Sequence, residues 1–338
     1  MEKRLILLFF TCTVCLTVSA QARDSTYAEK LGYPKGAKVL ILHVDDVGMS
    51  FDSNEGAINA ITKGVATSCS VMMPCAWVPA FVHYMKQHPG IDAGLHLTLT
   101  SEWDGYRWGP LSGKKITPGL ADAEGSMWHS VQDVVKHATA DEVEKEIRAQ
   151  LDRARSMGFE PTHFDSHMGT LLATPEFIQR YVKLGIENKI PVMLPAGHVT
   201  LIKKQMNTPE AQVLQLQTIG KMLWEAGLPV LDDLHNESYE WKIPPEIASD
   251  DKKLQHFKTE KYIKGVHSLK PGLTMMIMHC TATTEVFSHI SDSGPVRRGD
   301  MLAMMDPALE KAIQDEGIIL TTWREIMKKR QEQIVKNK

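Results

Sequence analysis

The chain has 338 residues, with 38 Lys or Arg against 41 Asp or Glu, so its formal net charge is −3 at pH 7. A hydrophobic fraction of 43% beside 23% charged residues is typical of a globular protein and excludes a disordered, collagen-like or coiled-coil chain. The near-neutral balance also argues against nucleic acid as a partner, because nucleic-acid binders usually carry a basic surplus.

The N-terminal segment has the pattern of a secretory signal peptide. Lys3 and Arg4 precede an apolar run over 5–18, and the small-residue pattern at 20–22 predicts cleavage after Ala22. The run is short for a membrane span, and a single N-terminal anchor is the alternative. We therefore expect residues 1–22 to be removed. The mature protein would then be periplasmic or extracellular, without a membrane span.

After a lead over 23–37, strand-like apolar runs alternate with longer amphipathic stretches. The predicted strands cover 39–44, 66–73, 91–97, 162–165, 191–194, 229–234, 273–278 and 317–321, and the predicted helices cover 53–63, 79–87, 141–157, 175–188, 210–226, 251–269, 307–314 and the stretch from 323 onward. This alternation, with no Pro/Gly/Ser-rich linker, predicts one parallel α/β domain over 38–338. The number of units favours a (β/α) TIM-like barrel over an open sheet. No glycine-rich phosphate-binding motif follows the first strand, which weighs against a nucleotide enzyme.

A long irregular insertion over 100–140 follows the third predicted strand. It contains Trp103, Tyr106, Trp108 and Trp128. Long loops in compact domains are usually functional or mobile. These aromatic side chains would either stack on a sugar or form a local core, and the sequence leaves both interpretations open.

Three cysteines would remain in the mature chain, namely Cys69, Cys75 and Cys280. An odd number allows at most one disulfide within a chain, and the spacing matches no zinc motif. We expect all three to be buried thiols that pack as small hydrophobic side chains.

Polar residues with catalytic chemistry recur where predicted strands end, which is where α/β barrels place their active sites. They are Asp45 and Asp46 on the first strand, His96 on the third, His163, Asp165 and His167 on the fourth, His198 after the fifth, Asp233 and His235 at the sixth, and His279 on the seventh. Alternation along a strand points the side chains at 163, 165 and 167 to one face. A carboxylate and two imidazoles from different strands could bind Zn²⁺ or a similar divalent ion and leave positions for water and substrate.

Several segments, in this order and spacing, resemble the YdjC-like carbohydrate deacetylases. The matching segments are 44–50 with Asn54, 64–68, 94–100, 163–167, 278–279, 298–302 and 317–324. The resemblance extends over about Lys38 to Ile326. It implies a distorted (β/α) barrel related to that of the NodB-type polysaccharide deacetylases. It also implies an enzyme that removes acetyl groups from N-acetylated sugars or oligosaccharides with one divalent metal ion.

The same resemblance implies a role for each matching residue. Asp46, His96 and His167 would bind the metal, Asp45 would be the general base and His279 the general acid. His163 and Asp165 would support the ligands or contact substrate, and Arg298 would orient a carboxylate. Apart from the resemblance, Trp103 and Trp108 are candidates for substrate contact because they are aromatic residues of the insertion. The donor set suits Zn²⁺, and Mg²⁺, Mn²⁺, Co²⁺ or Ni²⁺ would also fit. The oligomeric state, monomer or homodimer, is open.

The aromatic insertion and the predicted export signal set the sequence apart from cytosolic members of the family, and three single positions depart from the family pattern. Gly169 stands where another His is common, Cys280 replaces a Pro, and Met276 replaces an acidic residue. None of these departures removes an expected ligand. Two alternatives therefore stay open: a metal-dependent esterase or other hydrolase with a different acyl substrate, and a non-catalytic glycan-binding relative.

Overall fold

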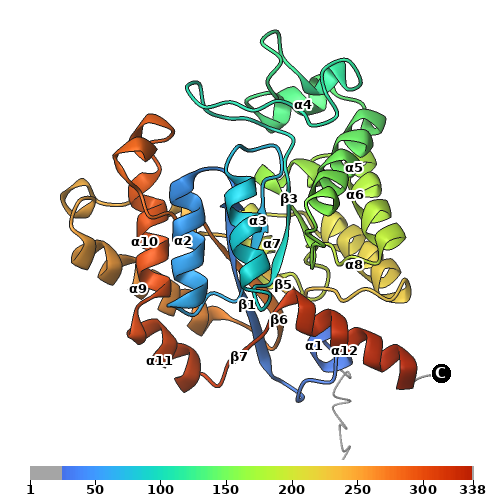
Figure 1. The fold of residues 1–338 in the computed structure, drawn as a ribbon. Coiled ribbons are helices and arrows are strands. Elements are labelled where there is room, and N and C mark those ends of the chain that lie inside the picture. The colour runs from blue at the N-terminus through green and yellow to red at the C-terminus, as the bar shows by residue number, and fades with distance from the viewer. Residues whose placement is uncertain (1–24, 337–338) are drawn as a thin grey trace, which may run out of the picture.

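The computed structural model of the protein describes residues 25–336 (Figure 1). The predicted signal peptide lies outside these residues. Within them, no helix is both long and apolar enough to cross a membrane.

A parallel sheet that curls into a distorted barrel forms the centre of the fold. Its strands are β1 (Lys38–Val47), β2 (Ser68–Val71), β3 (Ala93–Leu97), β4 (Phe164–Ser166), β5 (Asp233–His235), β6 (Gly272–Met278) and β7 (Ile319–Leu320). Their order is β4-β3-β2-β1-β6-β5, and β7 pairs with the beginning of β1. Parallel bridges from Phe164 to Val192 and from Pro195 to Leu231 link the two outer strands through an extended segment. The predicted α/β, TIM-like fold is thus confirmed.

Helices pack around this sheet (Figure 1). They are α1 (Tyr27–Lys30), α2 (Phe51–Thr62), α3 (Val78–Gln87), α4 (Val131–His137), α5 (Ala140–Ser156), α6 (Pro175–Asn188), α7 (Thr200–Met206), α8 (Glu210–Glu225), α9 (Asp251–Ser268), α10 (Gly294–Met304), α11 (Pro307–Asp315) and α12 (Trp323–Lys336). Short 3₁₀ turns are η1 (Pro118–Leu120), η2 (His167–Leu172), η3 (Ser238–Glu240), η4 (Pro245–Ile247) and η5 (Glu285–His289).

Helix α5 illustrates how the sequence sets these elements. Thr139 and Glu142 form a capping box, in which each side chain accepts a hydrogen bond from the other residue's backbone N–H. Val143, Ile147 and Leu151 recur every four residues and are all buried, so one face of the helix packs on the core.

Two differences from the predicted elements concern segments with weak local signals. The predicted strand over 191–194 is reduced to a single bridge at Val192, and the next bridge, at Pro195, lies just beyond it. Helix α10 was not predicted, since Gly294, Pro295 and Gly299 lower its intrinsic helix propensity. Its buried face, which includes Met301 and Met304, stabilises it in the tertiary structure.

Side-chain alternation along β1 divides the barrel interior into an apolar and a polar part. Val39 and Ile41 belong to a buried apolar cluster with Met275. On the same side of the strand, the next positions are His43 and Asp45, both buried. The barrel interior therefore changes from apolar to polar toward the carboxyl ends of the strands.

The insertion lies at that carboxyl end, and its α4 projects at the top of Figure 1. Trp108 is buried in it, and its indole N–H donates to the Thr100 carbonyl at 2.9 Å. The three cysteines that the structure describes are free and buried, as expected.

Candidate metal centre and active site

A backbone turn at the end of β1 brings two consecutive aspartates into one site. Successive side chains of a strand normally point to opposite faces. Asp46 instead has a φ of 63°, in the left-handed region that a residue other than glycine rarely adopts. Such conformations cluster at functional sites.

Three donor atoms form a nearly equilateral triangle; two come from strands β1 and β3, and the third comes from His167, directly after β4. Asp46 Oδ1 lies 3.3 Å from His96 Nε2 and 3.3 Å from His167 Nδ1, and the two imidazole nitrogens lie 3.2 Å apart. All three side chains are buried. Zn²⁺ with bonds of roughly 2.0–2.1 Å in tetrahedral geometry holds such donors about 3.3–3.4 Å apart. The residues present therefore fit a divalent metal ion.

The remaining polar atoms of these three residues are held by other side chains. His96 Nδ1 lies 2.6 Å from Asp165 Oδ1, and His167 Nε2 lies 3.1 Å from Glu102 Oε2. With each carboxylate accepting one N–H, the opposite ring nitrogen keeps its lone pair toward the triangle. Metal-binding histidines usually have such carboxylate partners, because these fix the tautomer and the ring orientation.

The third donor is oriented by an arginine. Arg297 Nη1 donates to Asp46 Oδ2 at 2.6 Å, and both side chains are buried. Burial alone would raise the pKa of Asp46, but Arg297 and the two histidines hold this pKa well below its usual range. No hydrogen bond reaches Asp46 Oδ1 from the described residues, so this oxygen is free to bind a cation.

The site as a whole favours positive charge. Burial would lower the pKa of His167, yet Glu102 and Asp46 together raise it to about 9. Carboxylates that face a buried imidazole stabilise a cation there, whether it is a proton or a metal ion.

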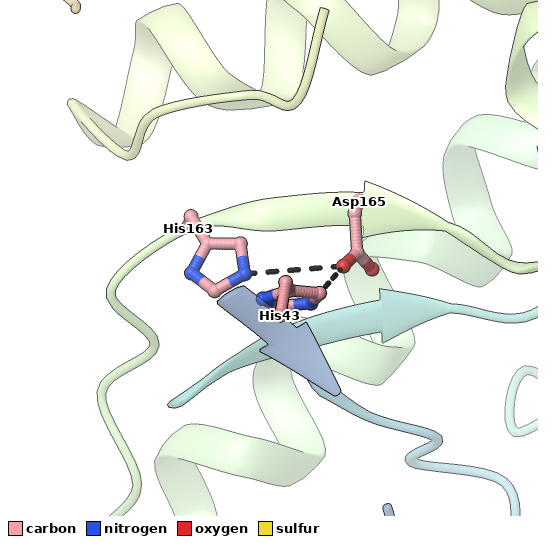
Figure 2. Close-up of side chains that lie close together, drawn as sticks. All are labelled: His43, His163 and Asp165. Carbon is pink, nitrogen blue, oxygen red and sulfur yellow. Dashed lines mark hydrogen bonds and ion pairs between the residues drawn. The ribbon is translucent and has the colours of Figure 1, made fainter. Parts of the chain in front are cut away.

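Behind His96 lies a second buried group, which consists of His43, His163 and Asp165 (Figure 2). His43 Nε2 lies 2.9 Å from Asp165 Oδ2 and 3.2 Å from Asp45 Oδ1. Burial would lower the pKa of His43, but its hydrogen bonds to both carboxylates raise it to about 9. His43 thus connects Asp45 with Asp165, the carboxylate that orients His96.

His163 is the third member of this group and lies near Asp165. Its Nε2 lies 3.8 Å from Asp165 Oδ2, and its ring stacks on Trp323 with centroids 4.9 Å apart. Burial keeps the pKa of His163 well below its ordinary value. Both His163 and Asp165 therefore lie behind the donor triangle.

Asp45 and His279 face each other beside the triangle. Asp45 Oδ2 is 3.9 Å from His279 Nε2 and also 3.9 Å from His96 Nε2. The backbone N–H of His279 donates to Asp300 at 3.1 Å, and Asp300 forms a fully buried ion pair with Lys258 at 2.6 Å. Burial is the main cause that lowers the pKa of His279.

The other three residues that the sequence predicted for the site, Arg298, Trp103 and Trp108, do not contact the donor triangle in the same way. Arg298 donates to the carboxylate of Asp251, at the start of α9, at 2.5 and 2.7 Å. The residue that contacts Asp46 is its neighbour, Arg297. Trp108 is part of the core, whereas Trp103 is partly buried with its ring 5.7 Å from the Arg297 guanidinium.

The family departure at Gly169 leaves the triangle complete. Gly169 has a φ of 65°, and a Cβ at this position would meet no atom within 4 Å. A side chain here would point into open space rather than replace one of the three donors.

Three side chains of this site were not predicted from the sequence: His43, Glu102 and Arg297. His43 had a usable signal, because it lies two residues before Asp45 on the same face of a strand. Glu102 begins the irregular insertion, and Arg297 lies on a helix without a strong sequence pattern. Neither position could be assigned from periodicity.

The fold and the site together define an α/β barrel protein with a candidate metal centre at the carboxyl ends of its strands. A family model described as "YdjC-like protein" matches residues 39–315. The chain belongs to this family, as the resemblance predicted.

Its relatives include proteins with assigned activities. It is 30% identical over 298 residues to a carbohydrate deacetylase of Thermus thermophilus, covering 88% of this chain and 97% of that protein. It is 32% identical over 135 residues to a chitooligosaccharide deacetylase of Yersinia enterocolitica, covering 38% of this chain and 49% of that protein. A solved structure, described as a putative cellobiose-phosphate cleavage protein of Enterococcus faecalis, has the same fold. Its TM-score is 0.68 at 18% identity, covering 86% of this chain and 99% of that one.

Proposed function

We propose that the protein is a metal-dependent carbohydrate deacetylase that removes an acetyl group from an N-acetylated sugar or oligosaccharide. The observation that carries this proposal is the donor triangle of Asp46, His96 and His167, with Asp45 and His279 beside it. The deacetylase relatives support the substrate class.

The triangle would hold one divalent ion. Its donor separations favour Zn²⁺, and Mg²⁺, Mn²⁺, Co²⁺ or Ni²⁺ are the alternatives. Such an ion polarises the acetyl carbonyl and acidifies water.

The protein's own residues would move the protons. Asp45 lies 3.9 Å from His96 Nε2 and 3.2 Å from His43 Nε2, so it is positioned to take a proton from the attacking water. His279, across from it, is positioned to protonate the departing amine. This protonation is needed because an amide nitrogen leaves poorly as an anion.

The test combines metal analysis with acetate release from N-acetylglucosamine and diacetylchitobiose. We expect Asp45→Asn to lower the rate at least about 100-fold while the protein retains its metal, as expected for loss of a general base. Asp46→Asn should lose metal and activity together. Asp251→Asn, which breaks only the surface pair with Arg298, is the matched control and should remain active.

Other outcomes would identify the alternatives. Acetate release from esters but not from acetamido sugars would indicate an esterase. Sugar binding without stoichiometric metal would indicate a non-catalytic relative. Either result would contradict the proposed function.

We further propose that the protein acts outside the cytoplasm, on the basis of the predicted signal peptide. N-terminal sequencing of protein from the periplasm or medium should begin at Arg23. An N-terminus at Met1 in cytoplasmic protein would contradict this location.

A further inference from the structure

Tyr239 is an exposed aromatic residue that lies against the site. It is on η3, directly after β5, and is 42% exposed. Its ring centroid lies 4.9 Å from that of His279, with 65° between the planes. The guanidinium of Arg297 lies 5.3 Å from the same ring and donates to the Tyr239 hydroxyl at 3.4 Å.

A second aromatic ring flanks the same arginine. Trp103, from the insertion, lies 5.7 Å from the Arg297 guanidinium. Behind it, Trp108 packs edge-on with ring centroids 5.8 Å apart and is buried. The arginine that holds Asp46 therefore lies within 6 Å of two aromatic rings, of which Tyr239 is the more exposed to solvent.

The position of Tyr239 is fixed by the same buried ion pair that fixes His279. Lys258 donates to the carbonyl of Ser238, the residue before Tyr239, at 2.9 Å. It also pairs with Asp300, which accepts the His279 backbone N–H. The Lys258–Asp300 pair thus fixes the backbone beside both Tyr239 and His279. A ligand that binds on Tyr239 would therefore meet a preorganised surface.

We infer that the exposed surface of Tyr239 is the platform on which the sugar ring of the substrate stacks. This inference rests on the proposed function. A pyranose ring has a face of C–H groups that packs on an aromatic ring, while its hydroxyl and acetamido groups project from the edge. His279 and Arg297 both contact the Tyr239 ring, so a sugar on the exposed surface of this ring would lie next to these two residues.

The test measures binding by calorimetry with diacetylchitobiose, together with KM and kcat for acetate release. Tyr239→Ala should weaken sugar binding about tenfold, as expected for loss of an aromatic contact, and should raise KM more than it lowers kcat. Tyr239→Phe keeps the ring and should restore binding to within about twofold of the wild type. Trp77→Ala is the matched control, because Trp77 is equally exposed at 42% but packs on Phe51 instead.

The results separate this inference from the proposed function. Wild-type acetate release with unchanged binding in Tyr239→Ala would overturn the platform alone, and so would an equal loss in Tyr239→Phe or Trp77→Ala. Wild-type sugar binding that depends on the Tyr239 ring, without any acetate release, would overturn the proposed function and leave the platform supported. A wild type that binds no acetylated sugar would overturn the platform.

Discussion

Each ligand side chain of the candidate metal centre has a charged neighbour on the polar atom that faces away from the triangle: Asp165, Glu102 or Arg297. Such partners restrict the rotamers of ligands before any ion binds, which lowers the cost of binding. Of the three, Glu102 is the only one that comes from the irregular insertion. Its contribution can be tested without changing a ligand.

We predict that Glu102→Gln weakens metal affinity about 10- to 100-fold, because the neutral amide no longer fixes the His167 tautomer as a carboxylate does. Competition with a chromogenic chelator measures this change. The control is Glu124→Gln in the same insertion, whose side chain is 77% exposed and lies 3.7 Å from the Arg107 guanidinium. Equal affinity of Glu102→Gln and wild type would show that Glu102 does not orient His167.

The lowered pKa of His163 predicts that the free energy of unfolding depends on pH. The pKa of this histidine in the folded protein lies well below 6.5, so below about pH 6.5 the unfolded chain binds a proton that the folded chain does not. Through this group, the free energy of unfolding therefore falls as the pH is lowered. The loss between pH 7.5 and pH 5.5 is on the order of 1 kcal/mol.

The variant His163→Phe keeps a ring for stacking on Trp323 and removes the titration. We expect urea unfolding of the metal-free proteins to show a smaller decline in stability toward pH 5.5 for this variant than for the wild type. The same decline in both proteins would mean that His163 is protonated in the folded state.

At the scale of elements, one buried carboxylate attaches the N-terminal helix to the barrel. Asp232, just before β5, accepts hydrogen bonds from the backbone N–H groups of Tyr27 and Ala28 at 2.8 and 3.0 Å. It also accepts one from Leu273 of β6 at 2.8 Å. Segments more than 200 residues apart in sequence thus share one anion at the N-terminus of α1.

We predict that Asp232→Ala lowers the free energy of unfolding by about 2–3 kcal/mol, because buried N–H groups lose a charged acceptor. Denaturant unfolding measures this loss. Asp250→Ala, which removes the N-cap of α9, is the matched control with a smaller expected loss. Equal losses in the two variants would mean that Asp232 acts only as a local cap.

The strand-end positions were readable from the sequence because a parallel sheet brings the carboxyl ends of its strands to one edge. This rule finds Asp46, His96 and His279, which the structure places together. It also selects Asp233 and His198, which instead pair with each other at 3.3 Å, while Asp233 binds backbone N–H groups at the start of α7.

The parts of the site that the sequence did not reveal come from tertiary packing. Arg297 lies on α10, whose stability depends on contacts with the rest of the fold rather than on its own propensity. Glu102 lies in a segment without periodicity, where direction cannot be inferred. The partners of the ligands were therefore harder to predict than the ligands themselves.

At the scale of the whole molecule, helix α5 joins the barrel to the insertion that reaches the site. Gln150 accepts the N–H of Thr98, directly after β3, at 3.0 Å and donates to Glu146 at 2.9 Å. Glu146 is fully buried and accepts the N–H groups of Leu111 and Ser112 at 3.0 and 2.8 Å. This chain of hydrogen bonds connects strand, helix and insertion.

We predict that Glu146→Ala loosens the insertion while the barrel stays folded. The Leu111 and Ser112 amides should exchange with deuterium at least about tenfold faster, because each loses a hydrogen bond to a charged group. Glu102 and Trp103 belong to the same segment, so metal affinity should also fall. Glu144→Ala, on the opposite side of α5 with Arg148 and Lys183, should change neither quantity.

If exchange of these amides is unchanged in Glu146→Ala, the insertion is held by its aromatic core rather than by α5. If exchange rises while metal affinity stays the same, Glu102 is positioned independently of the rest of the insertion.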